Sequence, residues 1–288
     1  MTNFDGQSVL VTGAGRGLGF AYARCLGQLG ATVLLHDVGA DPEGGGSDSS
    51  VAEGAAAGLR SEGVDAHAFS GPIDTREGCR ELTARAFAVR DRLDAVIQNA
   101  GWVAYEAVEE LHEASFDSMM AVAAKAPLWL AQAAWPHMKA AGYGRIVLTT
   151  SCRALYPQYV QHGLVSYAAA KMAAVGIVNV LAAEGAGRGI VVNAVSPVAK
   201  TRMWGVEDEP DELRPADVAP GVAFLASDAC TDGGWVLRAA NGQFHATRAC
   251  EAAGVDYPCD LRGVEAKTIA EIAANWSRIA IPAVEPRA

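Results

Sequence analysis

The sequence predicts an α/β fold, in which helices cover both faces of a parallel sheet. Short apolar runs rich in β-branched residues alternate with longer segments rich in Ala and Leu. Such continuous apolar strands are typical of parallel sheets, because these strands are buried on both faces. A glycine-rich stretch also connects the first apolar run directly to a helical segment. Together these features indicate a Rossmann-type, doubly wound parallel sheet.

The expected strands and helices alternate along the chain. Strands are expected from the apolar runs at residues 8–12, 32–36, 64–69, 95–98, 146–150 and 190–195. Helices are expected from the segments at residues 17–29, 49–62, 75–91, 114–124, 127–141, 164–185 and 216–227. Two connecting segments break the alternation, a glycine-rich loop at 39–47 and an acidic, proline-containing flap at 201–215.

The last part of the chain is expected to extend the same domain. A strand at 235–239 and a helix at 264–276 follow the main body, and the composition does not shift enough to mark a second domain. We therefore assign the Rossmann domain to residues 1–231 and a C-terminal strand and helix extension to residues 232–288.

Composition and charge exclude several classes of partner. The 288-residue chain has a net charge of −10 and no block of Lys or Arg, which argues against nucleic acid. Charges interrupt every long apolar stretch, so we expect no membrane span. The N-terminus has no basic segment followed by an apolar one, so we expect no secretory signal. The six cysteines form no C-x-x-C motif. They are expected to be reduced thiols of a cytoplasmic protein, and no metal site is predicted.

A glycine-rich turn at the end of the first strand predicts a dinucleotide site. Glycines in this turn permit a tight bend and close approach of the backbone to a ligand. The helix that follows offers free N–H groups and the positive end of its dipole to a pyrophosphate. The strand before it and the helix after it supply the context that this motif requires. The residues expected to bind the cofactor here are Gly13, Arg16, Gly17, Leu18 and Gly19.

Asp37 favours NAD over NADP as the cofactor. It lies at the end of the second strand, where a carboxylate accepts hydrogen bonds from the adenosine ribose. A 2′-phosphate at about 4 Å would cost roughly 4 kcal/mol against this charge, at an effective dielectric constant near 20. Arg16 points the other way, because its flexible side chain could reach such a phosphate. We give Asp37 the greater weight, since the strand end fixes its position.

Tyr167 and Lys171 are the candidate acid–base pair. They lie one helical turn apart, on the same face of the segment at 164–185. A nearby ammonium group favours the phenolate and so lowers the pKa of a tyrosine from its usual value of about 10. The same spacing also occurs on many solvated helix faces, so the pair needs support from the rest of the chain.

Further polar and glycine residues follow the other predicted strands. The carboxyl ends of parallel strands line one crevice in a doubly wound sheet, so these residues are expected to lie together with the pair. Each of them alone has a plain structural explanation as a turn, a helix cap or the start of a loop. They are Asn99, Ala100 and Gly101 after the fourth strand, Ser151 after the fifth, and Pro197, Val198 and Thr201 after the sixth.

In this order, these motifs resemble the short-chain dehydrogenase/reductase family over nearly the whole chain. Thr12 to Gly19 matches the glycine motif of the family, Asn99 to Gly101 its Asn-Ala-Gly, and Ser151, Tyr167 and Lys171 its catalytic triad. The chain looks most like the (3R)-hydroxyacyl-CoA dehydrogenase units of peroxisomal multifunctional enzymes, a group related to hydroxysteroid dehydrogenases. That likeness is carried by the long loop after Asp37 and by the segment at 196–203, among others.

The resemblance implies a role for each matched residue. Tyr167 would exchange a proton with the substrate oxygen, Ser151 would donate a hydrogen bond to that oxygen, and Lys171 would lower the pKa of Tyr167 and bind the nicotinamide ribose. Asp74 would contact adenine, although a solvated Asp before a helix is an equal interpretation. Thr201 would bind the carboxamide. A homodimer or homotetramer is also implied.

The chain departs from the family pattern at several positions. Gln98 replaces the first Asn of Asn-Asn-Ala-Gly, Val198 replaces a Gly after Pro197, and Ala123 stands where the family often has an Asn that connects the lysine to water. The segment from Ser151 to Tyr167 is about three residues longer than usual. It brings residues toward the expected substrate entrance. Trp102 and Trp204 could wall an apolar pocket there, although core packing explains either of them equally well. Those on the segment are Arg153, Tyr156, Tyr159, Gln161 and His162.

These observations predict an NAD-dependent oxidoreductase that interconverts a small, hydrophobic secondary alcohol and its ketone. The candidate substrates are a hydroxyacyl thioester, a hydroxysteroid or an aryl alcohol, and the lack of a Lys/Arg cluster weakens the thioester. A non-catalytic dinucleotide-binding regulator on the same fold is the alternative. A sugar epimerase or dehydratase is disfavoured by the glycine spacing and the small C-terminal region.

Overall fold

The computed structural model of this chain describes residues 3–206, 210–251 and 254–280. The chain divides into two compact units, Met1–Thr247 and Arg248–Ala288. The expected boundary between residues 231 and 232 therefore falls inside the first unit.

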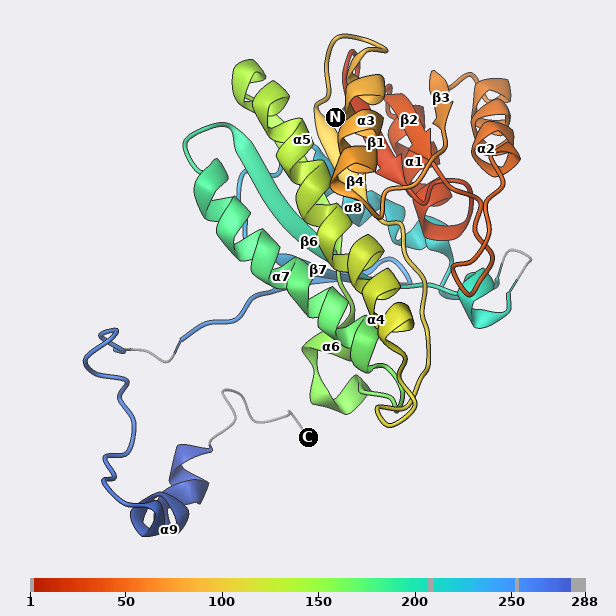
Figure 1. The fold of residues 1–288 in the computed structure, drawn as a ribbon. Helices are drawn as coiled ribbons and strands as arrows, with labels where there is room; N and C mark the ends of the chain where they lie inside the picture. The colour runs from red at the N-terminus through yellow and green to blue at the C-terminus, as the bar shows by residue number, and fades with distance from the viewer. Residues whose placement is uncertain (1–2, 207–209, 252–253, 281–288) are drawn as a thin grey trace. The chain divides into compact units, whose positions relative to one another are not determined.

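The first unit is built on an eight-stranded sheet with the order β3-β2-β1-β4-β5-β6-β7-β8 (Figure 1). Neighbouring strands from β3 to β7 are parallel, and β8 is antiparallel to β7. This topology confirms the predicted doubly wound α/β fold. The strands are β1 (Ser8–Thr12), β2 (Thr32–His36), β3 (Ala66–Phe69), β4 (Ala95–Gln98), β5 (Gly144–Thr149), β6 (Ile190–Val198), β7 (Val236–Ala240) and β8 (Gln243–Thr247).

Helices cover both faces of this sheet, and a hydrophobic core lies on each side. Val9 and Val11 of β1 pack with α1, α2 and α8, whereas Leu10 packs with α3, α5 and α7. Figure 1 shows α5 and α7 running beside each other on the second face. The helices are α1 (Gly17–Gln28), α2 (Ser50–Ser61), α3 (Arg76–Phe87), α4 (Glu113–Met120), α5 (Ala126–Ala141), α6 (Cys152–Leu155), α7 (Val165–Gly185) and α8 (Ala219–Ala226).

The switch point of this topology lies between β1 and β4. β1 leads into α1 on one face, and β4 leads through α4 into α5 on the other face. The chain therefore diverges at the carboxyl ends of these two strands and leaves a crevice there. The glycine-rich turn and the Asn99–Gly101 segment both lie at this edge.

Helix α7 is long and apolar enough to cross a membrane by length and composition alone. In the structure it packs instead against β6 and α4. Its buried side includes Ala170, Lys171 and Val178. The length and apolar composition of α7 are therefore those of a helix that covers the sheet.

The hairpin of β7 and β8 was not predicted in full. Its second strand has an exposed, mixed sequence without an apolar run, so the periodicity did not reveal it. A two-residue Asn241–Gly242 turn joins the strands, and both residues have positive φ angles of 48° and 69°. Asn-Gly is the preferred dipeptide for this type of hairpin turn. That dipeptide was the signal that could have revealed the hairpin.

The second unit contains α9 (Ile269–Ile279), which begins five residues later than expected. The Thr268 side chain accepts a hydrogen bond from the Glu271 N–H, and the Glu271 carboxylate accepts one from the Lys267 N–H. This pair resembles a capping box, except that the carboxylate bonds the residue before the cap, and it sets the start of the helix.

Candidate active site

The glycine-rich turn after β1 is closed by contacts that leave no room for side chains. A Cβ on Gly19 would lie 2.0 Å from the carbonyl oxygen of Gly13, and one on Gly13 would lie 2.8 Å from the Cα of Ala100. Gly13 and Gly17 also have positive φ angles of 64° and 54°, which favour glycine. No side chain caps the first turn of α1. Its N–H groups are therefore available to an anion.

A cavity of about 740 Å³ lies beside this turn. The fit of the site to a dinucleotide is good, because small residues bring the backbone to the cavity wall and a helix N-terminus faces it. Gly19 is the one predicted residue of the turn that does not line it, since it packs under Gly13. The predicted cofactor-binding residues that line this cavity are Gly13, Arg16, Gly17, Leu18, Asp37, Asp74, Asn99, Ala100, Gly101 and Thr201.

The carboxylate of Asp37 is held by the backbone at the end of β2. One oxygen accepts a hydrogen bond from the Gly15 N–H and the other from the Gly39 N–H, both at 2.8 Å. Two arginines line the same cavity, the exposed Arg16 and also Arg202. Arg202 donates to the carbonyl oxygen of Ala40 at 3.0 Å, so it lies on the loop beside Asp37. The sequence analysis identified Arg16 as a cation that could reach a 2′-phosphate, but it did not identify Arg202.

A second cavity, of about 500 Å³, contains the predicted triad. Ser151, Tyr167 and Lys171 line it, as do Pro197 and Val198. It shares several lining residues with the dinucleotide cavity, so the two adjoin at the carboxyl edge of the sheet. The shared residues are Leu18, Asn99, Gly101, Trp102, Thr201 and Met203.

Burial dominates the protonation of the central pair. Lys171 is 3% exposed, its Nζ lies 5.8 Å from the centre of the Tyr167 ring, and it donates to the Thr149 carbonyl at 3.0 Å. Loss of hydration lowers the pKa of Lys171 to about 8. Burial also raises the pKa of Tyr167, and a hydrogen bond with Ser151 and the charge of Arg153 offset only part of this.

The direction for Tyr167 is opposite to the expected one. The sequence argument assumed that the ammonium of Lys171 would outweigh the loss of hydration around the phenol. In the structure both groups are enclosed, and desolvation disfavours the charged form of each. Tyr167 therefore holds its proton at neutral pH, as a general acid must.

Ser151 lies just past β5, at the start of α6. Its Oγ accepts a hydrogen bond from the Arg153 N–H at 3.2 Å and so caps this short helix. The side chain is nearly buried, and its contact with Tyr167 brings the two hydroxyl groups together. An oxygen atom of a substrate between them would meet two hydrogen-bond donors.

A π-helical turn, Ala121–Lys125, joins α4 to α5 beside the pair. Such widened turns are rare and are frequent at functional sites. Ala123 is fully buried here, in a small apolar cluster with Met119 and Ala170, and Tyr167 packs against this cluster. The Gln98 side-chain amide donates to the Val122 carbonyl at 3.3 Å. The side chain of Ala123 thus offers no polar atom for a proton relay.

Other residues singled out in the sequence have mixed positions. Trp102 and Trp204 both line the catalytic cavity, together with Tyr159 and Gln161. His162 is exposed and is not among the lining residues. Sequence reasoning missed Arg238, which reaches this cavity from β7. Only the order of the strands brings that residue to the cavity that Tyr167 also lines.

The model of the short chain dehydrogenase family matches residues 7–211. The chain belongs to the short-chain dehydrogenase family. It is 36% identical to mouse (Mus musculus) peroxisomal multifunctional enzyme type 2 over 242 residues. That match covers 83% of the chain but only 32% of the mouse enzyme, so this dehydrogenase spans about a third of its length.

Two solved structures extend the comparison. A short chain dehydrogenase from Mycobacterium avium is 28% identical, with a TM-score of 0.81, and the match covers 97% of this chain and 98% of that one. A metagenomic short-chain oxidoreductase in complex with NADP is 27% identical, with a TM-score of 0.66. That match covers 77% of this chain and 91% of the oxidoreductase. Both support the fold, and the second of them contains a bound nicotinamide dinucleotide.

Replacing Lys171 by Met should remove the pH-dependent cost in folding stability that the buried ammonium group imposes. Burial lowers the pKa of Lys171 from 10.5 to about 8. Below this value both the folded and the unfolded chain hold the proton, and the enclosed charge costs stability. As the pH rises toward 10.5 the folded protein is already neutral, so the penalty fades. The stability advantage of Lys171→Met over the wild type should shrink by about 2 kcal/mol between pH 7 and pH 9.5.

Urea unfolding at the two pH values measures this difference. Lys139→Met, at an exposed position of α5, is the matched control and should show no such trend. An advantage of Lys171→Met that stays constant with pH would contradict the lowered pKa.

Proposed function

We propose that this short-chain dehydrogenase interconverts a secondary alcohol and its ketone, with NAD as the cofactor. The observation that carries the proposal is the meeting of two cavities at one sheet edge. One contains the glycine turn, and the other contains Ser151, Tyr167 and Lys171. Trp102, Tyr159 and Trp204 line the second cavity and favour a substrate with an apolar or aromatic body. The complete triad, within an oxidoreductase family, argues against a non-catalytic regulator.

The proposed chemistry follows from the protonation of the pair. The nicotinamide ring of the bound cofactor supplies or accepts the hydride. In ketone reduction Tyr167 donates its phenolic proton to the carbonyl oxygen, while Ser151 donates a hydrogen bond to the same oxygen. Below pH 8 Lys171 is an ammonium ion that stabilises the phenolate formed in this step. Alcohol oxidation reverses each transfer, with the phenolate as the base.

Tyr167→Phe removes the proton donor and keeps the ring. We expect kcat to fall at least about a hundredfold, because general acid–base catalysis contributes this much, while the affinity for NADH stays the same. NADH absorbance with a panel of hydroxysteroids, acyl-CoAs and aryl alcohols measures turnover. Tyr257→Phe removes the same atom at an exposed position of the second unit and should leave turnover unchanged. Full activity of Tyr167→Phe would refute the proposed role.

The preference for NAD is proposed from the geometry of Asp37. Both carboxylate oxygens are fixed by backbone N–H groups, so the side chain cannot turn away from a 2′-phosphate without losing these bonds. Arg16 and Arg202 line the same cavity and would offset part of the repulsion. The Asp37 carboxylate, which two hydrogen bonds hold in place, should repel a 2′-phosphate more strongly than the exposed Arg16 attracts it.

Asp37→Asn should therefore shift the cofactor preference. We expect the ratio of kcat/KM for NADP over NAD to rise about a hundredfold, which is within the roughly 4 kcal/mol that two like charges at 4 Å cost. Asp41→Asn removes a charge from the same cavity wall but away from the strand end, and should change this ratio much less. Equal use of both cofactors by the wild type would sink the proposal.

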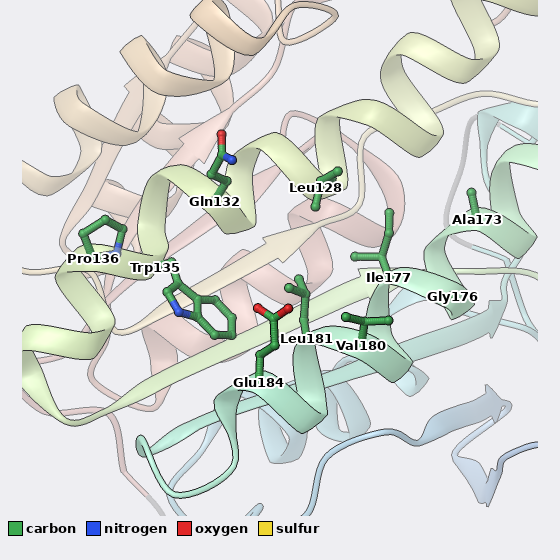
Figure 2. Close-up of a pocket in the computed structure, with 10 residues that line it drawn as sticks. All are labelled: Leu128, Gln132, Trp135, Pro136, Ala173, Gly176, Ile177, Val180, Leu181 and Glu184. Carbon is green, nitrogen blue, oxygen red and sulfur yellow. The ribbon is translucent and has the colours of Figure 1, made fainter.

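We propose that the chain also assembles as a homo-oligomer through α5 and α7. These helices flank a surface hollow of about 650 Å³. Figure 2 shows Trp135 of α5 and Leu181 and Glu184 of α7 directed into the same space. Val180 is 57% exposed and Met172 is 44% exposed on α7. An apolar face of two long helices is suited to a second copy related by a two-fold axis.

Val180→Glu should weaken this association, because it places a charge in the centre of the apolar face, one turn from Glu184. Light scattering after size-exclusion chromatography should show oligomers for the wild type and a monomer for the variant. Val108→Glu changes another highly exposed valine outside this hollow and should leave the mass unchanged. A monomeric wild type would contradict the proposed interface.

A further inference from the structure

The lining of the catalytic cavity has an unusual charge. Among the residues described, three cationic side chains line it and no Asp or Glu does, although the whole chain carries a net charge of −10. The cationic residues are Arg153, Lys171 and Arg238. Lys171 belongs to the catalytic pair. The two arginines therefore need a separate explanation.

Arg238 is held in the wall by aromatic rings. It lies on β7 opposite Ser196 of β6, and its guanidinium group is 5.2 Å from the ring centre of Tyr156 and 5.5 Å from that of Tyr159. In the described part of the chain it forms no ion pair with a carboxylate, and its buried Nε has no hydrogen-bond partner. Stacking on rings orients a guanidinium group without using its N–H donors.

Arg153 lies on the same wall, two residues after Ser151. Its Nη1 donates to the Tyr105 hydroxyl at 2.7 Å, and that hydroxyl donates to Gln161 at 2.9 Å. Its guanidinium carbon is 6.0 Å from the ring centre of Trp204. The charge of Arg153 also acts on the pKa of Tyr167, so it lies within electrostatic range of the proton donor. Both arginines are thus oriented by neutral groups.

An arginine in a ligand cavity with no protein carboxylate beside it is suited to an anionic ligand. The planar fork of N–H donors matches a carboxylate in size and geometry. Arg153 and Arg238 also place two positive charges in one cavity, so a bound anion would reduce their mutual repulsion. The same anion could accept a hydrogen bond from the buried Nε of Arg238, which otherwise has no partner among the described residues. A purely structural role for both residues would leave these costs in place.

We propose that the substrate of this dehydrogenase carries a carboxylate, which Arg238 and Arg153 bind while Ser151 and Tyr167 contact the reacting oxygen. The proposal rests on the proposed oxidoreductase function and specifies its substrate as a hydroxy acid or keto acid. The apolar body of that acid lies against Trp102, Tyr159 and Trp204. A cavity of about 500 Å³ accommodates such a molecule of moderate size.

A series of keto acids of increasing length tests the proposal. The probes are 4-acetylbenzoate, (4-acetylphenyl)acetate and 3-(4-acetylphenyl)propionate, each paired with its neutral methyl ester. Calorimetric titration of the enzyme saturated with NADH gives both affinities for each pair. We expect at least one acid to bind ten times more tightly than its ester, or better. The length of that acid would report the separation of the arginines from the triad.

Variants assign the preference to the arginines. Arg238→Met keeps the length and the apolar stem of the side chain, and should reduce the acid-to-ester preference to threefold or less. Arg238→Lys keeps the charge without the planar fork and should retain part of the preference. Arg188→Met is the control, because Arg188 is exposed in the loop before β6, at the opposite edge of the sheet. Unchanged NADH affinity in each variant verifies that the fold is intact.

The outcomes separate the two proposals. Acids that bind no more tightly than esters throughout the series overturn the carboxylate site, and so does a preference that survives both Arg238→Met and Arg153→Met. Turnover of neutral alcohols under those outcomes leaves the oxidoreductase standing. An arginine-dependent preference for acids, without reduction of any ketone in the series or the wider panel, supports the anion site and counts against the oxidoreductase.

Discussion

The site depends on the hydrogen bonds that join the ends of β1 and β4. The Thr12 hydroxyl accepts from the N–H groups of both Asn99 and Ala100 at 3.1 Å. The Asn99 amide donates in return to the carbonyl oxygens of Thr12 and Gly13 at 3.2 Å. These bonds bring the glycine turn against the Asn-Ala-Gly segment, so that a Cβ on Gly13 or Gly19 would collide with backbone or with Asn99. Both cavities share this floor, and their adjacency follows from it.

Enclosure then sets the chemistry above this floor. Lys171 and Tyr167 are enclosed beside the carboxyl edge of the sheet, where loss of hydration disfavours both the ammonium and the phenolate. The same enclosure strengthens the electrostatic interactions of any charged group in the site, because the local dielectric constant is low. Arg153 therefore influences Tyr167 from the cavity wall. An anionic substrate would change this balance, which couples substrate recognition to the protonation of the catalytic pair.

Much of the fold and the site was accessible from local patterns. Continuous apolar strands, the glycine turn and the Tyr-x-x-x-Lys spacing each reflect constraints within one or two elements, and the structure has them as expected. Two features were not accessible in this way. β8 is an exposed edge strand, whose side chains do not need an apolar pattern. The pKa of Tyr167 depends on everything packed around it, and that enclosure comes from α4, the π-helical turn and the segment after Ser151.

The sequence by itself therefore determined the family, the doubly wound parallel sheet and the residues that follow its strands into the crevice. These follow from backbone geometry and from burial on both sheet faces, which leave direct marks in residue spacing. Only the tertiary structure decided the balance of charge in the catalytic cavity. Arg153 and Arg238 are 85 positions apart in the chain, and Arg238 reaches the site only because β7 pairs beside β6. Electrostatic environment is a sum over neighbours in space, so it has no signature in a single stretch of sequence.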